Sequence, residues 1–289
     1  MFQVGCAPIT WNNEDLRDLR PPVPPARVLD DIRAAGYTGT ELGNGFPRQP
    51  ADLRRALADR GLALPSAWCG LSLRGEAADL ERTRELCGLL AQVSAEFVNL
   101  AHAGTPERRA WAGRAGEPDC PRLSAPEWDQ LAAAVSQAAE VARAAGLQAA
   151  FHPHVGTWVE TGEEVHDLLR RTDAGLVKLC WDVGHAVYAG SDPLALIRAA
   201  PERIAYVHLK DVARTIRDTL VRDALGFEEG VRRGVFTELG RGCLDVPGVL
   251  DALRAIGYNG WLMVEQDSSS LEPIDSARVS RAYLRQLGV

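Results

Sequence analysis

The sequence lacks the features by which a chain attaches to a membrane or to nucleic acid. No apolar run reaches the length of about 18 residues that a membrane-spanning helix needs, and nothing resembles a signal peptide. The net charge is −7, the pI is near 5.5, and no stripe of basic residues runs along the chain. A chain of this charge is not attracted to phosphate backbones or anionic lipids. We therefore expect neither a membrane nor nucleic acid as a partner.

Paired cysteines are also missing. The six cysteines, at positions 6, 69, 87, 120, 180 and 243, are scattered and form no Cys-x-x-Cys pair. Cys6, Cys69 and Cys180 fall in or beside apolar runs, where a free thiol behaves as a small apolar group. This usage predicts buried free thiols in a reducing compartment, and we expect a cytoplasmic protein.

No Gly-x-Gly-x-x-Gly motif follows the first apolar run, which weighs against an open nucleotide-binding sheet. The 289 residues instead alternate between strand-like and helix-like segments. The expected strands are residues 2–7, 39–43, 62–68, 96–100, 148–151, 176–179, 204–209 and 260–265. The expected helices are residues 26–35, 50–60, 76–94, 124–145, 161–171, 193–200, 246–256 and 275–287. Eight alternations predict an α/β fold of one domain, the closed (β/α)8 TIM barrel, with a doubly wound sheet as the alternative.

The longest stretch without regular periodicity lies at about residues 211–244, after the seventh expected strand. It carries five arginines between residues 214 and 233. Long irregular connections inside a compact domain are usually lids or binding loops. Such a loop could close over a site, pack on a neighbouring subunit of a homo-oligomer, or recognise a phosphate or carboxylate. The sequence leaves these alternatives open.

Polar side chains gather where the expected strands end. Five of the six histidines lie at such ends, at positions 102, 152, 154, 185 and 208. In a parallel barrel these ends meet at one face, where barrel enzymes keep their chemistry. Asp182, His208 and Glu265, with an imidazole from His152 or His154, form a mixed oxygen and nitrogen set. Such a set suits Mn²⁺, Co²⁺, Mg²⁺ or Zn²⁺ and leaves open positions for a substrate.

Each of these residues also has a plainer interpretation. A single histidine at a strand end is more often a hydrogen-bonded scaffold residue, although packing alone seldom gathers five on one face. His185, three residues after Asp182, could bind a hydroxyl or move a proton. Lys210 could stabilise an enolate oxygen or act as an acid–base group, and the alternative is a structural salt bridge with Asp211 or Asp182.

Four further residues are candidates for contact with a small-molecule substrate: Trp11, Glu41, His154 and Glu160. Trp11 could wall a pocket, but a tryptophan half-buried under a loop gives the same pattern. Glu41 ends the second expected strand and could equally be a structural acid. Glu160 could lie near the site or only favour a helix N-terminus. His152, His154 and Glu160 all remain candidates for the metal ligand that the fifth strand supplies.

Several strings of residues resemble one family over nearly the whole chain. They lie at residues 9–13, 36–44, 151–161, 182–185, 207–211 and 262–267. The string His-Pro-His-Val-Gly-Thr at 152–157 is the most specific, whereas the last two are shared by many members of the superfamily. On these residues the chain resembles the xylose-isomerase-like TIM barrels, and within them the inosose dehydratases.

The resemblance implies a metal site and a reaction. The family's metal is held by a strand-five residue, usually Glu, and by Asp, His and Glu after the next three strands. The matching positions here are His152, Asp182, His208 and Glu265, with a histidine where Glu is common. The implied enzyme is a lyase that removes water from a cyclic polyol ketone such as 2-keto-myo-inositol through an enediolate. Its usual cofactor is Mn²⁺ or Co²⁺, and His185, Lys210 and Glu265 would be catalytic.

Two other functions compete with this hypothesis. A metal-dependent ketose epimerase would share the first half of the reaction and return the proton to the other face of the substrate. A sugar-binding barrel without activity would show a degraded ligand set, whereas Asp182, His208 and Glu265 are present. The endonucleases of the superfamily are excluded, because the chain lacks a basic surface and further metal ligands.

Overall fold

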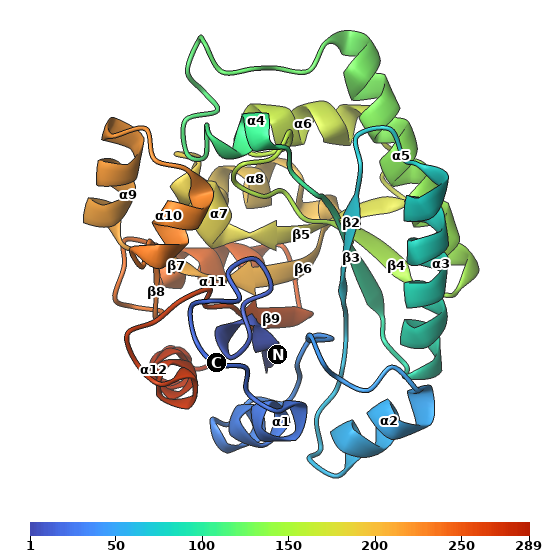
Figure 1. The fold of residues 1–289 in the computed structure, drawn as a ribbon, viewed down its shortest axis with the longest axis vertical. Helices are drawn as coiled ribbons and strands as arrows, with labels where there is room; N and C mark the ends of the chain where they lie inside the picture. The colour runs from blue at the N-terminus through green and yellow to red at the C-terminus, as the bar shows by residue number, and fades with distance from the viewer.

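The computed structural model describes residues 1–289, and its centre is a parallel sheet of seven strands (Figure 1). In chain order the strands are β1 (Gln3–Cys6), β2 (Trp68–Leu71), β3 (Phe97–His102), β4 (Gln148–Phe151), β5 (Val177–Asp182), β6 (Ile204–Leu209) and β9 (Trp261–Val264). In space they follow the order β1-β9-β6-β5-β4-β3-β2. Every pair is parallel.

Residues 38–42 and 63–67 complete the barrel, although they form only isolated bridges. Gly39 pairs with Gly5 of β1 on one side and with Ala63 on the other, and the chain after Ala63 continues into β2. A Cβ atom on Gly39 would lie 2.4 Å from the Trp261 ring, so only glycine allows the backbone to approach there. Counting this segment, the parallel strands close into the predicted single-domain TIM barrel.

Helices surround the sheet, as Figure 1 shows for α1, α2, α3 and α5. The helices after the barrel strands are α1 (Pro25–Ala34), α2 (Pro50–Ala58), α3 (Ala77–Gln92), α5 (Ala125–Ala144), α6 (Gly162–Arg171), α8 (Pro193–Ala199), α11 (Val246–Ala255) and α12 (Pro273–Gln286). They lie within a few residues of the expected ranges. α5 and α6 begin at capping boxes formed by Ser124 with Glu127 and by Thr161 with Glu164. No helix is long and apolar enough to cross a membrane.

Two layers of apolar side chains hold the barrel together. A cluster of 57 buried residues lies chiefly between the sheet and its helices. A second cluster of six comes from the strands themselves and includes Cys180, Tyr206, Trp261 and Met263. Cys6, Cys69 and Cys180 are buried free thiols, as predicted. Packing of this extent fixes the strand ends, on which the site depends.

Residues 211–244 are more regular than the sequence predicts. β7 (Asp211–Val212) and β8 (Phe236–Thr237) form a short antiparallel pair, and between them lie α9 (Arg214–Arg222) and α10 (Phe227–Arg232). These elements pack around a separate cluster of ten buried residues. The expectation of an irregular loop was therefore wrong. The two helices leave no clear helical period in the sequence, because each is short and buries few residues, and in α9 only Leu220 is buried. The short helices α4 (Pro106–Arg109) and α7 (Val183–Tyr188) were also missed.

Candidate metal centre and active-site pocket

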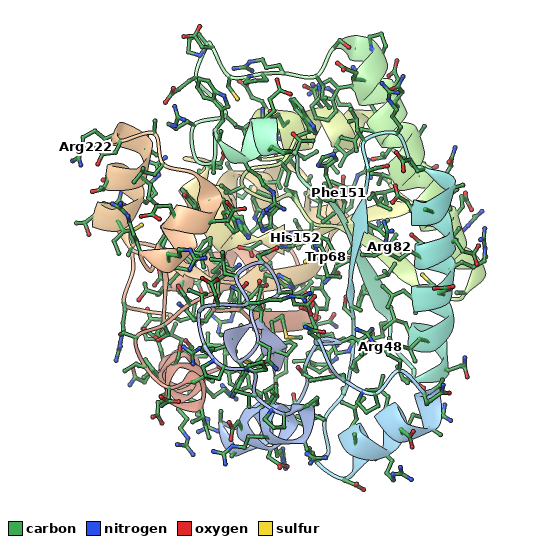
Figure 2. The ribbon with its side chains drawn as sticks, viewed as in Figure 1. Arg48, Trp68, Arg82, Phe151, His152 and Arg222 are labelled. Atoms are coloured by element: carbon green, nitrogen blue, oxygen red, sulfur yellow. The ribbon has the colours of Figure 1, made fainter.

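A pocket of about 260 Å³ lies at the carboxyl ends of the barrel strands. Its lining includes Glu41, His152, His154, His208, Glu265 and Asp267. His152 is labelled near the middle of the barrel in Figure 2, where the strand ends converge. The expected gathering of strand-end histidines and carboxylates therefore exists. Asp182, His185 and Lys210 lie buried just beneath the lining.

Asp182 is the central carboxylate of this group. Its Oδ1 accepts a hydrogen bond of 2.8 Å from the His185 backbone N–H, and this bond caps α7. Its Oδ2 lies 3.6 Å from His152 Nε2 and 3.8 Å from His208 Nδ1 and has no hydrogen-bond partner. The strand-to-helix turn therefore fixes one oxygen and leaves the other facing three imidazoles, those of His152, His185 and His208, and the Lys210 ammonium.

His208 is oriented by a second carboxylate. Its Nε2 lies 3.0 Å from Glu41 Oε1, which also accepts a hydrogen bond of 2.9 Å from the Asn99 amide. Its Nδ1 lies 2.6 Å from Glu265 Oε2, a distance at which a proton or a metal ion must lie between the ring nitrogen and the carboxylate oxygen. Histidines that bind metals commonly hold their other N–H in such a carboxylate contact. Glu41 thus lines the pocket and also orients His208.

Lys210 is completely enclosed by acidic and aromatic groups. Its Nζ lies 2.9 Å from Asp267 Oδ2 and 3.0 Å from Glu265 Oε1. It also lies 4.5 Å from the centre of the Phe236 ring. Burial alone would lower the pKa of Lys210, but Asp267, Glu265 and Asp182 together raise it above its usual value. The lysine is therefore charged and offers three N–H donors.

The salt bridge considered as the plainer role for Lys210 exists in part. Its Nζ lies 3.6 Å from Asp182 Oδ2. Asp211 is not a partner, because its side chain accepts hydrogen bonds from the backbone N–H groups of residues 212, 240, 242 and 244. Gly184 makes room for the lysine, since a Cβ there would lie 2.5 Å from the Lys210 carbonyl oxygen.

Two neutral imidazoles stack beside the lysine. His185 Nε2 lies 3.3 Å from Lys210 Nζ, and the ring centres of His185 and His154 are 3.8 Å apart. Burial, His154 and Lys210 hold the pKa of His185 well below its usual value. Burial, His152 and Lys210 lower the pKa of His154 to about 3. The lysine N–H therefore donates to His185, whose own proton is on Nδ1.

Buried nitrogen and oxygen atoms without partners point to a cation site. Both ring nitrogens of His152 and Oδ2 of Asp182 have no hydrogen-bond partner. Leaving such an atom unsatisfied costs about 1–3 kcal/mol. The ligating atoms of His152, Asp182 and His185 lie within 4.8 Å of one another, and so do those of Glu41, His208 and Glu265. These donors fit a divalent metal ion such as those that bind mixed oxygen and nitrogen sets.

Cys180 also approaches this group, with its sulfur near His152 and His208. Burial raises the pKa of Cys180 to about 12, so its thiol is neutral in the absence of a bound ion. The other two groups of donors consist of oxygen and nitrogen atoms alone.

Two of the residues expected beside the substrate lie elsewhere. Trp11 is 1% exposed and outside the pocket lining, and its indole N–H donates a 3.0 Å hydrogen bond to Asp31 of α1. It belongs to the main apolar core, because its indole packs there and its N–H reaches Asp31. Glu160 is also buried outside the lining, where its carboxylate accepts hydrogen bonds of 2.8 Å and 2.6 Å from the N–H groups of Gly113 and Gly156.

Three residues that border the site were not among those predicted from the sequence. Asp267 lines the pocket and contacts Lys210, and its position two residues after Glu265 on the same strand end was an available signal. Phe227 and Phe236 come from the segment 211–244. The Phe227 ring lies 4.9 Å from that of His154, and the Phe236 ring lies 5.2 Å from that of His185. No local pattern places these two residues at the site, since their distance in sequence hides the contact.

The barrel and the residues at its strand ends together indicate the class of protein to which the chain belongs. The chain belongs to the xylose isomerase-like TIM barrel family, whose model matches residues 29–287. It is 33% identical over 293 residues to an inosose dehydratase of Geobacillus kaustophilus, an alignment that covers 99% of this chain and 94% of the relative. It is 36% identical over 290 residues to the rhizopine catabolism protein MocC of Rhizobium meliloti, covering 99% and 88%.

The fold comparison agrees with the sequence comparison. The solved structure of the IOLI protein with a bound zinc atom superposes with a TM-score of 0.74 at 14% identity, covering 99% of this chain and 98% of that one. With inosose dehydratases among its full-length relatives, the chain is an enzyme of the carbon–oxygen lyase class.

Proposed function

We propose that the protein is a metal-dependent dehydratase that removes water from a cyclic polyol ketone such as 2-keto-myo-inositol. The observation that carries the proposal is the group of donor atoms of His152, Asp182, His208 and Glu265 at the base of the pocket, among which both His152 nitrogens and Asp182 Oδ2 have no hydrogen-bond partner. The full-length similarity to inosose dehydratases supports the reaction class. The pocket of about 260 Å³ has room for a six-carbon ring with its hydroxyl groups.

His152, Asp182, His208 and Glu265 would hold the ion, which we propose to be Mn²⁺ or Co²⁺, with Mg²⁺ and Zn²⁺ as alternatives. When bound, a divalent ion polarises a ketone oxygen and stabilises the negative charge that develops there. The chain prepares this position without the ion. Glu41 fixes the ring of His208, and the cap of α7 fixes Asp182.

Glu265, in addition to its place at the ion, Lys210 and His185 are the residues that we assign to proton transfer. Glu265 lines the pocket with Oε1 beside Lys210 and Oε2 beside His208, so its carboxylate is placed to accept the proton from the carbon next to the ketone. Next to Glu265, Lys210 Nζ shares a proton with neutral His185, and we propose that this proton is transferred to the departing hydroxyl. The C–H bond and the C–O bond break, and the hydroxyl leaves as water with one proton.

The test is an activity assay on metal-stripped protein with each ion added back singly. We expect the conjugated product of 2-keto-myo-inositol to appear by absorbance with Mn²⁺ or Co²⁺. We expect the rate to fall at least about 10³-fold in Asp182→Ala and Glu265→Ala. Asp251→Ala is the matched control, because its side chain is 76% exposed and pairs only with Arg254.

Two results would overturn the dehydratase. One is metal binding without any product. The other is exchange of the substrate's C–H proton with solvent deuterium but no loss of water, which would identify the ketose epimerase instead.

A further inference from the structure

One wall of the pocket carries an aromatic side chain that the protein leaves open. Trp68, at the start of β2, is 55% exposed, whereas the only other exposed large apolar side chain is that of Met1 at the chain end. Its ring rests over Gly70, where a Cβ would lie 2.5 Å from the indole. Figure 2 labels Trp68 close to His152 in projection, and both residues line the pocket.

The part of the lining around β2, β3 and α3 includes apolar side chains. Ala67, Leu86 and Ala101 belong to it, while carboxylates and imidazoles line the side of β6 and β9. An exposed indole is unfavourable in water, and burying it against a ligand is favourable in proportion to the apolar area covered. The electron-rich face of the ring also attracts the positively polarised hydrogens of C–H bonds.

His102 supplies a polar group of known direction on the same wall. Its Nδ1 accepts a hydrogen bond of 2.9 Å from the Gly104 backbone N–H. An acceptor at Nδ1 requires the neutral ring to carry its proton on Nε2. Burial and Arg108 lower the pKa of His102 to about 4, so the ring is neutral. The ring lines the pocket, and Nε2–H is therefore a fixed donor there.

We propose that Trp68 and His102 form a recognition wall for a saturated six-membered polyol ring. The ring lays one C–H face on the Trp68 indole, and one of its oxygens accepts a hydrogen bond from His102 Nε2. A ring whose hydroxyls are mostly equatorial presents axial C–H bonds on its faces, whereas an open chain of the same composition has no such flat face. This inference rests on the proposed function and names the residues that select its substrate class.

The experiment combines steady-state kinetics with ligand binding. In Trp68→Ala we expect KM for 2-keto-myo-inositol to rise about 10-fold with kcat within about threefold, and in Trp68→Phe to rise only about twofold. In His102→Ala we expect a rise of about 3- to 10-fold, largely restored in His102→Gln, whose amide N–H can take the place of Nε2–H. Thermal unfolding of the Trp68 variants should match that of the wild type, because the side chain is half-exposed.

Binding is measured separately with two ligands of six carbons and six hydroxyls, the ring myo-inositol and the open-chain sorbitol. We expect myo-inositol to change the tryptophan emission of the wild type and to leave that of Trp68→Phe unchanged, because Trp68 is the only one of the seven tryptophans that lines the pocket. We expect the dissociation constant of myo-inositol, but not that of sorbitol, to rise in Trp68→Ala.

The outcomes separate this inference from the proposed function. An emission change on binding myo-inositol without turnover of the ketone would sink the dehydratase and keep the wall. Normal turnover with KM unchanged in Trp68→Ala and His102→Ala would overturn the wall and keep the dehydratase. Equal weakening of both ligands in Trp68→Ala, or no binding of myo-inositol to the wild type, would also overturn it.

Discussion

Ion pairs between a basic and an acidic side chain occur at both the floor of the pocket (Lys210, Asp267 and Glu265) and its mouth (Arg109 and Glu228). They are buried at the floor and exposed at the mouth. At the floor, the Lys210 side chain is 1% exposed and contacts the carboxylates of Asp267 and Glu265. At the mouth, Arg109 of α4 and Glu228 of α10 form an ion pair of 2.9 Å with side chains 38% and 50% exposed. Buried charges that lose a partner cost several kcal/mol, while exposed pairs contribute about 1 kcal/mol or less. The floor is therefore fixed for chemistry, and the mouth is only loosely held.

Lys210→Met, at the floor, is expected to have the largest effect on stability. It leaves the carboxylates of Asp267 and Glu265 buried without their cation, so we expect the free energy of unfolding to fall by about 3–5 kcal/mol. Activity should fall as well, because the proton held at Nζ is lost. Denaturant unfolding measures the first effect and the product assay the second.

The chain supplies a matched control for this change. Lysine occurs at only one other position, and Lys178 makes a single hydrogen bond to the Glu202 carbonyl. We expect Lys178→Met to change stability by less than about 1 kcal/mol. Equal destabilisation by the two variants would contradict the special cost assigned to the floor.

A smaller effect, on pH dependence, is expected at Glu160, which is buried outside the pocket lining. Burial raises the pKa of Glu160 from 4.5 to about 7 in the folded chain. Because the folded chain keeps its proton to a higher pH than the unfolded chain, this group's contribution to stability falls as the pH rises from about 4.5 to 7. The loss amounts to roughly 3 kcal/mol.

Glu160→Gln removes this titration. We expect the variant's stability relative to the wild type to rise over that pH range, as measured by denaturant unfolding at pH 5, 6, 7 and 8, a series chosen around the pKa of about 7. A difference that stays flat with pH would show that the hydrogen bonds from Gly113 and Gly156 keep the carboxylate ionised throughout.

The smallest effect is expected at the mouth. Glu228→Gln removes the partner of Arg109 and should lower the free energy of unfolding by less than about 1 kcal/mol, with the remaining difference reduced by added salt. A loss of several kcal/mol would contradict the comparison, because it would show that the ion pair at the mouth stabilises the protein as much as the buried one at the floor.

The barrel could be predicted because its strand–helix period and helix caps are local properties. The capping boxes at Ser124 and Thr161 formed as expected, and the four proposed metal ligands came from motifs at strand ends. Prediction failed where a long-range contact decides the structure. Gly39 forms only isolated bridges and lies so close to the Trp261 ring that a Cβ would not fit, and Trp11 is a core residue whose N–H donates to Asp31.

The segment 211–244 shows the same limit. Its two short helices are stabilised by an apolar cluster that includes Tyr188 and Val155, far away in sequence. No window within the segment contains those partners, and its own apolar residues are too few to give a clear period. Phe227 and Phe236 reach the histidines only because this cluster positions α10 and β8.

The most direct measurement is anomalous diffraction from crystals of the protein grown with Mn²⁺, with data collected at the manganese absorption edge. We predict one strong peak bonded to a ring nitrogen of His152 and to Oδ2 of Asp182, atoms that have no hydrogen-bond partner, with His208 and Glu265 as the other ligands. A peak elsewhere, or unaltered side chains with no peak, would contradict the metal centre on which the proposed reaction depends.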